Sequence, residues 1–115
     1  MSEITYQIIR ADGSTERRSH VLPDDRASIY RAVVQIVSRV IGPDAHLEHV
    51  NVYDEGRYKD MFVDETGHLK SLPYNKLATK IYHRNYRKHR PDEYCPKIMP
   101  KIVGNAVLFN EKVWR

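Results

Sequence analysis

Residues 62–82 read FVDETGHLKSLPYNKLATKIY, and this stretch places a strand end, a turn and a helix start in succession. Phe62 and Val63 close an apolar run. The Asp-Glu-Thr-Gly that follows favours a tight turn, because Asp accepts hydrogen bonds from nearby backbone N–H groups and Gly tolerates positive φ. A Leu-Pro pair then stiffens the approach to Asn75, a preferred helix N-cap residue. The stretch therefore predicts a strand, a turn and a helix that begins after Asn75.

Upstream of this stretch, the sequence predicts a β-hairpin and one amphipathic helix. Residues 4–10 and 15–21 mix β-branched and aromatic residues with polar ones, and an Asp-Gly pair lies between them as a hairpin signal. Pro23-Asp24-Asp25 supplies a helix start, with an Asp near the N-cap position, and a Gly-Pro pair ends that helix. The apolar residues of this helix recur on one side: Ile29, Val33, Ile36, Val37 and Val40.

The remaining segments complete a sheet. Residues 46–53 and 58–63 predict two strands joined by a turn, and residues 68–72 predict a short edge strand. Residues 102–109 predict a last strand, which a Gly-Asn pair splits. Proline residues punctuate residues 83–101, which we expect to form a basic insertion before that last strand.

These elements predict a single α+β domain over residues 1–115, in the order ββαββ(β)αβ. We expect a mostly antiparallel sheet with two helices packed on one face. The length of 115 residues, with 41% apolar and 30% charged residues, is typical of a small globular protein with one core.

The composition excludes several classes of protein. No apolar run approaches the roughly 20 residues that a membrane-spanning helix needs. The N-terminal sequence lacks the basic start and apolar stretch of a secretory signal. The single cysteine, Cys95, cannot form an intrachain disulfide. We therefore expect a cytoplasmic protein with no membrane partner.

Charge is unevenly distributed along the chain, although the net charge is only +4. Residues 44–65 contain seven acids against two bases, and residues 70–101 contain nine Lys or Arg against two acids. The two segments either form faces of opposite sign or neutralise each other in the fold.

The helix after Asn75 carries a basic stripe on the side opposite Leu77 and Ile81. Its candidate contact residues for a partner protein or for nucleic acid are Lys76, Lys80, Arg84, Tyr86, Arg87, Lys88 and Arg90. Such a stripe can follow a phosphate backbone, with tyrosines available for stacking. It can equally dock on an acidic protein, where Tyr and Arg often anchor. A solvated outer face without a partner is the third interpretation.

The opening stretch also carries a resemblance to a known family. The motif here is V-D-E-x-G-x-L-K-x-L-P-x-N-x-x-A-T over residues 63–79, followed by I-x-G-x-A-V-L over residues 102–108. In these segments the chain resembles a family of small phage- and plasmid-borne proteins, domain of unknown function 3846. The resemblance implies a mobile-element origin and supplies no catalytic residues. Residues 83–101 are longer and more basic than the family pattern, so the resemblance implies no role for them.

Most of this motif suits a structural role, but four polar members are candidates for contact with a small ligand: Asp64, Glu65, Lys70 and Asn75. No phosphate-binding loop, nucleophile motif or cysteine pair accompanies them. The histidines and the cysteine have no spacing typical of a metal site. We therefore predict no catalytic residue, no metal and no cofactor.

Together these observations predict a small non-enzymatic binding protein of a phage or other mobile element, which occupies a host macromolecule in the host cytoplasm. Antagonism of a host defence complex of the CRISPR type is its most concrete form. One alternative is an accessory protein that binds nucleic acid through the helix of residues 75–90. The other is a binder of a small ligand such as a nucleotide. The sequence does not set the oligomeric state.

Overall fold

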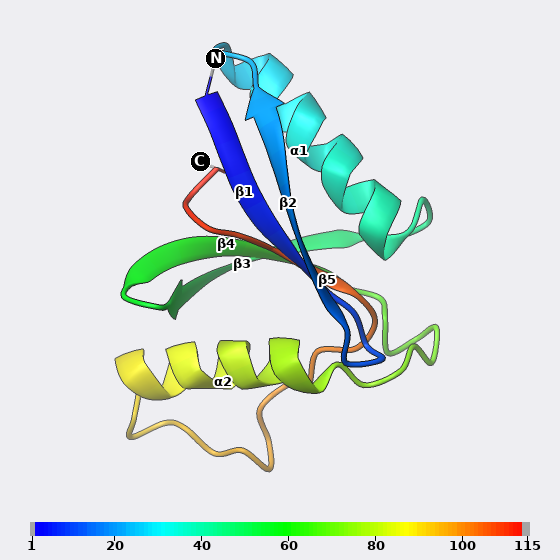
Figure 1. The fold of residues 1–115 in the computed structure, drawn as a ribbon. Helices are drawn as coiled ribbons and strands as arrows, with labels where there is room; N and C mark the ends of the chain where they lie inside the picture. Colours follow the sequence, from blue (N-terminus) through cyan, green and yellow to red (C-terminus); the bar gives the residue numbers. More distant parts are fainter. Residues whose placement is uncertain (1, 114–115) are drawn as a thin grey trace.

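Five antiparallel strands form one sheet in the order β2-β1-β5-β4-β3, and two helices pack on it (Figure 1). The computed structural model describes residues 2–113. Along the chain the elements are β1 Ser2–Ile9, β2 Thr15–Leu22, α1 Arg26–Ile41, β3 Leu47–Asp54, β4 Arg57–Asp64, α2 Lys76–His89 and β5 Ala106–Phe109. The α+β class and the order of these seven elements are as the sequence predicts.

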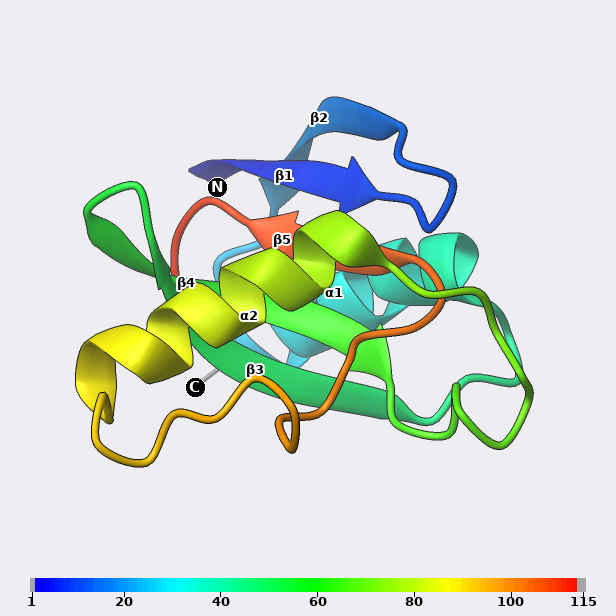
Figure 2. The same cartoon turned by 90° about the horizontal axis from the view of Figure 1, so that it is seen from below.

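The two helices cover opposite faces of the sheet, which corrects the expectation that both pack on one face (Figure 1 and Figure 2). α1 packs on a core that includes Ile8, whereas α2 packs on a core that includes Ile9. Because consecutive side chains of a strand point to opposite faces, these two neighbours belong to different layers. All four residues of β5 are buried. A continuous apolar run of this kind is typical of a strand covered on both faces.

Residues 66–72 form turns rather than the expected edge strand. Their backbone N–H groups donate to carbonyls only a few residues earlier in the chain; for example, the Leu72 N–H donates to the Gly67 carbonyl at 3.1 Å. A backbone group that is satisfied inside a turn does not pair with a sheet edge, so no strand forms here. Gly67 does not have the positive φ expected of it. A Cβ at this position would lie 2.7 Å from Val103 Cγ2, so close packing is what requires glycine.

Asn75 is buried, and its side chain links the start of α2 to the sheet through hydrogen bonds. Its Nδ2 donates to the carbonyls of Ile9 at 2.9 Å and Gly104 at 2.8 Å. Its Oδ1 accepts from the Ala78 N–H at 3.1 Å and so caps the helix. Gly104 has a φ of +77°, and a Cβ there would lie 2.8 Å from Leu72 Cδ1. These contacts fix where α2 begins on the sheet and therefore which side of the helix faces outward.

Only a narrow strip along one side of α2 is buried. Its buried residues are Ala78, Thr79 and Ile81. The Thr79 hydroxyl accepts from the Ile102 N–H at 2.8 Å, which ties the helix to the segment before β5. The helix ends at His89, two residues before a proline, as the conformational restriction ahead of proline favours. The rest of its circumference is left for solvent and for the segment that follows.

Candidate functional site

The segment that follows α2 runs back beside the helix (Figure 2). A groove of about 520 Å³, named here the basic groove, lies between α2 and this segment. It is lined by Tyr74, Lys76, Thr79, Lys80, His83, Arg84, Arg87, Tyr94, Pro96 and Lys101. Five of these residues are Lys or Arg and three are Tyr or His. Since no residue in this lining is acidic, the groove presents a basic and aromatic surface.

Four of the five cations come from α2. They are spaced four, four and three residues apart, which places them on one side of the helix: Lys76, Lys80, Arg84 and Arg87. From the first to the last, the row extends over roughly 16 Å at 1.5 Å per residue. The fifth cation, Lys101, belongs to the other wall.

Two histidines hold that other wall in place. His83 Nε2 donates to the Pro100 carbonyl at 2.9 Å, and His68 Nε2 donates to the Lys101 carbonyl at 2.8 Å. The Tyr94 hydroxyl lies 3.4 Å from His83 Nδ1. These contacts fasten residues 94–101 to α2 on one side and to the turns of residues 66–72 on the other, so the groove has two defined walls.

Most cations of the groove have no anionic partner in the part of the chain that the structure describes. Arg84 is the exception, because its Nη1 lies 3.3 Å from Asp54 Oδ1. No carboxylate of residues 2–113 lies within ion-pair distance of the other four. The Arg87 guanidinium and Lys101 Nζ lie 5.7 Å and 5.5 Å from the centroids of the groove's two tyrosine rings, which is a cation–π distance. The groove therefore keeps a net positive charge.

Three of the predicted contact residues lie outside the groove. The Tyr86 hydroxyl donates to Glu93 Oε2 at 3.3 Å, and Arg90 Nη1 lies 3.4 Å from the same oxygen. Lys88 Nζ lies 4.5 Å from the centroid of the Tyr53 ring. The structure thus gathers in the groove four residues of the predicted set: Lys76, Lys80, Arg84 and Arg87.

The polar residues of the motif have internal partners. The Asp64 carboxylate accepts from Lys70 Nζ at 2.9 Å and from the Thr66 hydroxyl at 2.8 Å. Burial by itself would raise the pKa of Asp64, but the Lys70 ammonium and the Thr66 hydrogen bonds outweigh it and lower the pKa to about 2. Both polar atoms of the Asn75 side chain are engaged, whereas Glu65 is exposed. Contact of any of these residues with a ligand stays a prediction.

The acidic segment does not form an acidic face, because three of its carboxylates are buried: Asp54, Asp60 and Asp64. Asp54 lies between two cations, with Lys59 Nζ at 3.2 Å and Arg84 Nη1 at 3.3 Å. Asp60 lies 2.5 Å from His49 Nε2. From Lys59 to Asp64 every residue of β4 is buried, so the polar residues of this part of the strand are enclosed on both faces of the sheet. These three buried acids therefore pair with basic side chains inside the fold.

Other site chemistries find little support in the described part of the chain. Within residues 2–113, no three His, Cys, Asp or Glu side chains are grouped so that they could hold a metal ion. None of the helices described is both long and apolar enough to cross a membrane. Cys95 is a partly buried free thiol. The basic groove has a clear chemical capacity, which is the binding of anions.

Comparisons with known proteins do not assign a role to the groove. No protein-family model, curated protein or solved structure matches the chain. The resemblance to domain of unknown function 3846 stays a prediction, and the geometry of the groove is the basis for a functional proposal.

Proposed function

We propose that the protein binds single-stranded nucleic acid in the basic groove and catalyses no reaction. The observation that carries this proposal is the row of α2 cations in one groove with two tyrosines, most of these cations having no carboxylate partner among residues 2–113. A phosphate backbone is attracted to such a row because Lys and Arg displace its condensed counterions. The tyrosines can stack on unpaired bases with little dependence on sequence.

The geometry of α2 favours a single strand over a duplex. Helices that read duplex DNA enter the major groove, which is about 12 Å wide, and a helix with its side chains is already about 10–12 Å in diameter. Residues 94–101 lie along the basic side of α2, and the sheet packs on its buried side. These neighbours make α2 too wide to enter the major groove. A flexible strand can instead lie along the groove.

An acidic host protein, such as a component of a defence complex, is the competing partner. Stable protein interfaces have an apolar centre that becomes fully buried. The lining of the groove is mainly cationic, and exposed apolar residues such as Leu69 and Ile98 are not part of it. The groove therefore fits nucleic acid better, and a protein partner becomes an outcome of the test.

The test is the binding of a fluorescently labelled single-stranded oligonucleotide, followed by anisotropy at several salt concentrations. If three to five phosphates are neutralised, the logarithm of the association constant should fall linearly with the logarithm of salt, with a slope of about −2 to −3.5. Absence of binding at low salt would contradict the proposal and leave an acidic protein as the partner to seek.

Paired charge reversals locate the contact. Lys80→Glu with Arg87→Glu should lower the affinity at least tenfold and leave the melting temperature nearly unchanged, because exposed charges contribute at most about 1 kcal/mol each. Arg31→Glu with Arg39→Glu changes the net charge equally on the exposed side of α1 and is the matched control. Equal losses in both double variants would show non-specific attraction and contradict a site in the groove. Arg84 is left intact because its reversal would place a second carboxylate beside Asp54.

A further inference from the structure

A second hollow lies on the sheet itself, on the face that α2 packs against but with no residue of α2 in its lining. β5 stays paired with β1 as far as Phe109, and the Asn110 N–H then donates to the Thr5 carbonyl at 3.0 Å. The pairing of β5 with β4 already ends at Leu108 and Met61. Beyond this point β4 separates from its neighbour and leaves a cleft of about 250 Å³.

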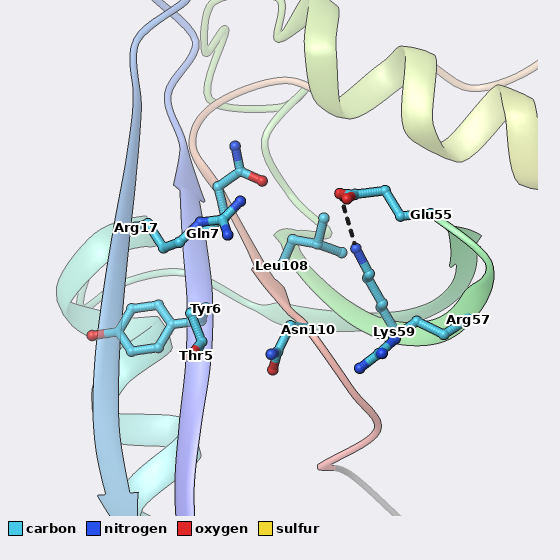
Figure 3. Close-up of a pocket in the computed structure, with 9 residues that line it drawn as sticks. All are labelled: Thr5, Tyr6, Gln7, Arg17, Glu55, Arg57, Lys59, Leu108 and Asn110. Carbon is cyan, nitrogen blue, oxygen red and sulfur yellow. Dashed lines mark hydrogen bonds and ion pairs between the residues drawn. The ribbon is translucent and has the colours of Figure 1, made fainter.

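The walls of the cleft carry cations and carboxamides (Figure 3). Gln7 and Arg17 are directly paired on β1 and β2 and form one wall. Arg57 and Lys59 form the other, and Leu108 with Asn110 lies between them. The register places Gln7 and Arg17 on the face opposite α1, because Tyr6 and Ile8 beside them belong to the α1 core.

Several polar groups of the cleft have no hydrogen-bond or ion-pair partner among the residues that the structure describes. Asn110 Oδ1 is buried and accepts no hydrogen bond. Among the described residues, the side chains of Gln7, Arg17 and Arg57 make no hydrogen bond or ion pair. Lys59, in contrast, is neutralised by Asp54 at 3.2 Å and by an exposed glutamate. The uncompensated charge of the cleft is therefore that of the two arginines, one on each wall.

Glu55 acts as a resident anion at the edge of the cleft. Its Oε1 lies 3.3 Å from Lys59 Nζ. The hydrogen bond from Lys59 lowers the pKa of Glu55, and the charges of Arg17 and Arg57 lower it further. All three cations therefore act on one point in the cleft, where this glutamate supplies an anion that a ligand could replace.

We propose that this cleft binds a phosphate group, held between Arg17 and Arg57 and contacted by the carboxamides of Gln7 and Asn110. A tetrahedral phosphate presents oxygens in several directions and can contact guanidinium groups on both walls, whereas the two coplanar oxygens of a carboxylate match one guanidinium. The volume is below the roughly 300–1,000 Å³ of sites for drug-sized ligands, so only the phosphate and a small attached part are enclosed. The site is separate from the basic groove and does not depend on its function.

The probes are inorganic phosphate, adenosine 5′-monophosphate, adenosine and a single-stranded oligonucleotide, each added to isotopically labelled protein and followed in amide NMR spectra. The amides of Gln7, Arg17 and Leu108 should shift in a saturable way with phosphate or the monophosphate, and not with adenosine. A response to the oligonucleotide alone would identify the phosphate as that of a bound strand. No response to any phosphate-bearing probe, or an equal response to adenosine, would overturn the proposal.

Variants separate this cleft from the groove. Arg17→Gln with Arg57→Gln should weaken binding of the effective phosphate probe at least tenfold without lowering the melting temperature, because both arginines are exposed. Arg18→Gln with Arg39→Gln removes the same charge elsewhere and should change the affinity less than twofold. Glu55→Gln removes the resident anion and should tighten binding several-fold. An unchanged affinity in the first double variant would contradict the site, whatever the groove variants do to oligonucleotide binding.

Discussion

The two helices pack on opposite faces of the sheet, yet they are held there in different ways. α1 buries three apolar residues, and its N-cap, Asp25, is exposed. α2 buries only Ala78, Thr79 and Ile81, and its N-cap, Asn75, is buried and makes three side-chain hydrogen bonds. Apolar burial therefore holds the first helix, and directed polar contacts contribute much of what holds the second.

This difference relates stability to function. A helix fastened at its first turn and along a narrow side leaves most of its surface free for other uses. On α2 that surface carries four of the five cations of the basic groove, and three of these four have no carboxylate partner in the described part of the chain. Substitutions inside the α1 layer should therefore affect folding, whereas substitutions on the outer side of α2 should affect binding.

The largest effect is expected in the α1 layer. Val37 is fully buried, so Val37→Asp would enclose an unpaired charge and destabilise by more than about 4 kcal/mol, enough to unfold a domain of this size. Val34→Asp, on the exposed side of the same helix, should cost far less. Circular dichroism melting curves measure both. A Val37→Asp variant that melts within a degree or two of the parent would contradict the assignment of this layer as the apolar support.

The two N-caps give the sharpest contrast between the helices. Asn75→Ala should cost about 3–4 kcal/mol, because loss of a cap costs about 1 kcal/mol and two buried carbonyls lose their donor. Asp25→Ala removes an exposed cap, whose carboxylate accepts from the Ser28 N–H, and should cost about 1 kcal/mol. Urea unfolding measures the difference. Equal costs would mean that the buried hydrogen bonds of Asn75 contribute no more to stability than an ordinary N-cap.

Acidic pH should lower the stability of the protein, because the Asp64 carboxylate loses its contacts with Lys70 and Thr66 in the turns before α2 when it is protonated. The pKa of Asp64 is lowered from 3.8 to about 2 in the fold, so its contribution is fully present above about pH 5 and is lost as the pH falls toward 2. A shift of nearly two pKa units corresponds to about 2 kcal/mol. Between pH 5 and pH 2, the parent should lose about that much more stability than Asp64→Asn, and Glu65→Gln should behave as the parent does. Parallel pH profiles for the parent and Asp64→Asn would contradict this role of the carboxylate.

The smallest effect is expected at Gly104, whose carbonyl accepts a hydrogen bond from Asn75. Gly104 and Gly13 both have positive φ, but only at Gly104 would a Cβ meet a neighbour, Leu72 Cδ1 at 2.8 Å. Gly104→Ala should therefore cost about 1 kcal/mol more than Gly13→Ala, because both share the conformational cost of about 1–2 kcal/mol and only the first adds a clash. Truncation of Leu72 to Ala in the Gly104→Ala background should remove that excess. An excess that persists would show that the strain lies in the backbone.

The sequence predicted the elements better than their placement. The spacing of Val33, Ile36 and Val37 identifies α1, and the cap at Asn75 identifies the start of α2. The run of residues 106–109 was the signal that both faces of the sheet are covered, because a strand with one solvated face would alternate. The segment of residues 68–72 resembles a strand in composition, but its hydrogen bonds close within turns.

Half of the basic groove could be predicted, because helical spacing alone places Lys76, Lys80 and Arg87 on one side of α2. The other wall could not. Lys101 reaches the groove only because two histidines bind the backbone of residues 100–101. The burial of the acids in β4 could not be predicted either, because it depends on tertiary packing. The alternation of apolar and polar residues along β4 does not show that α2 covers the second face of the sheet.

The most direct test of the contrast between the helices is an NMR map of oligonucleotide binding on the folded protein. Addition of a single-stranded oligonucleotide should produce the largest amide shifts in residues 76–87 and at Lys101, and should leave the amides of α1 unchanged. Largest shifts on α1, or no shifts with oligonucleotide in excess at low salt, would contradict the division of the molecule into a supporting layer and a binding layer.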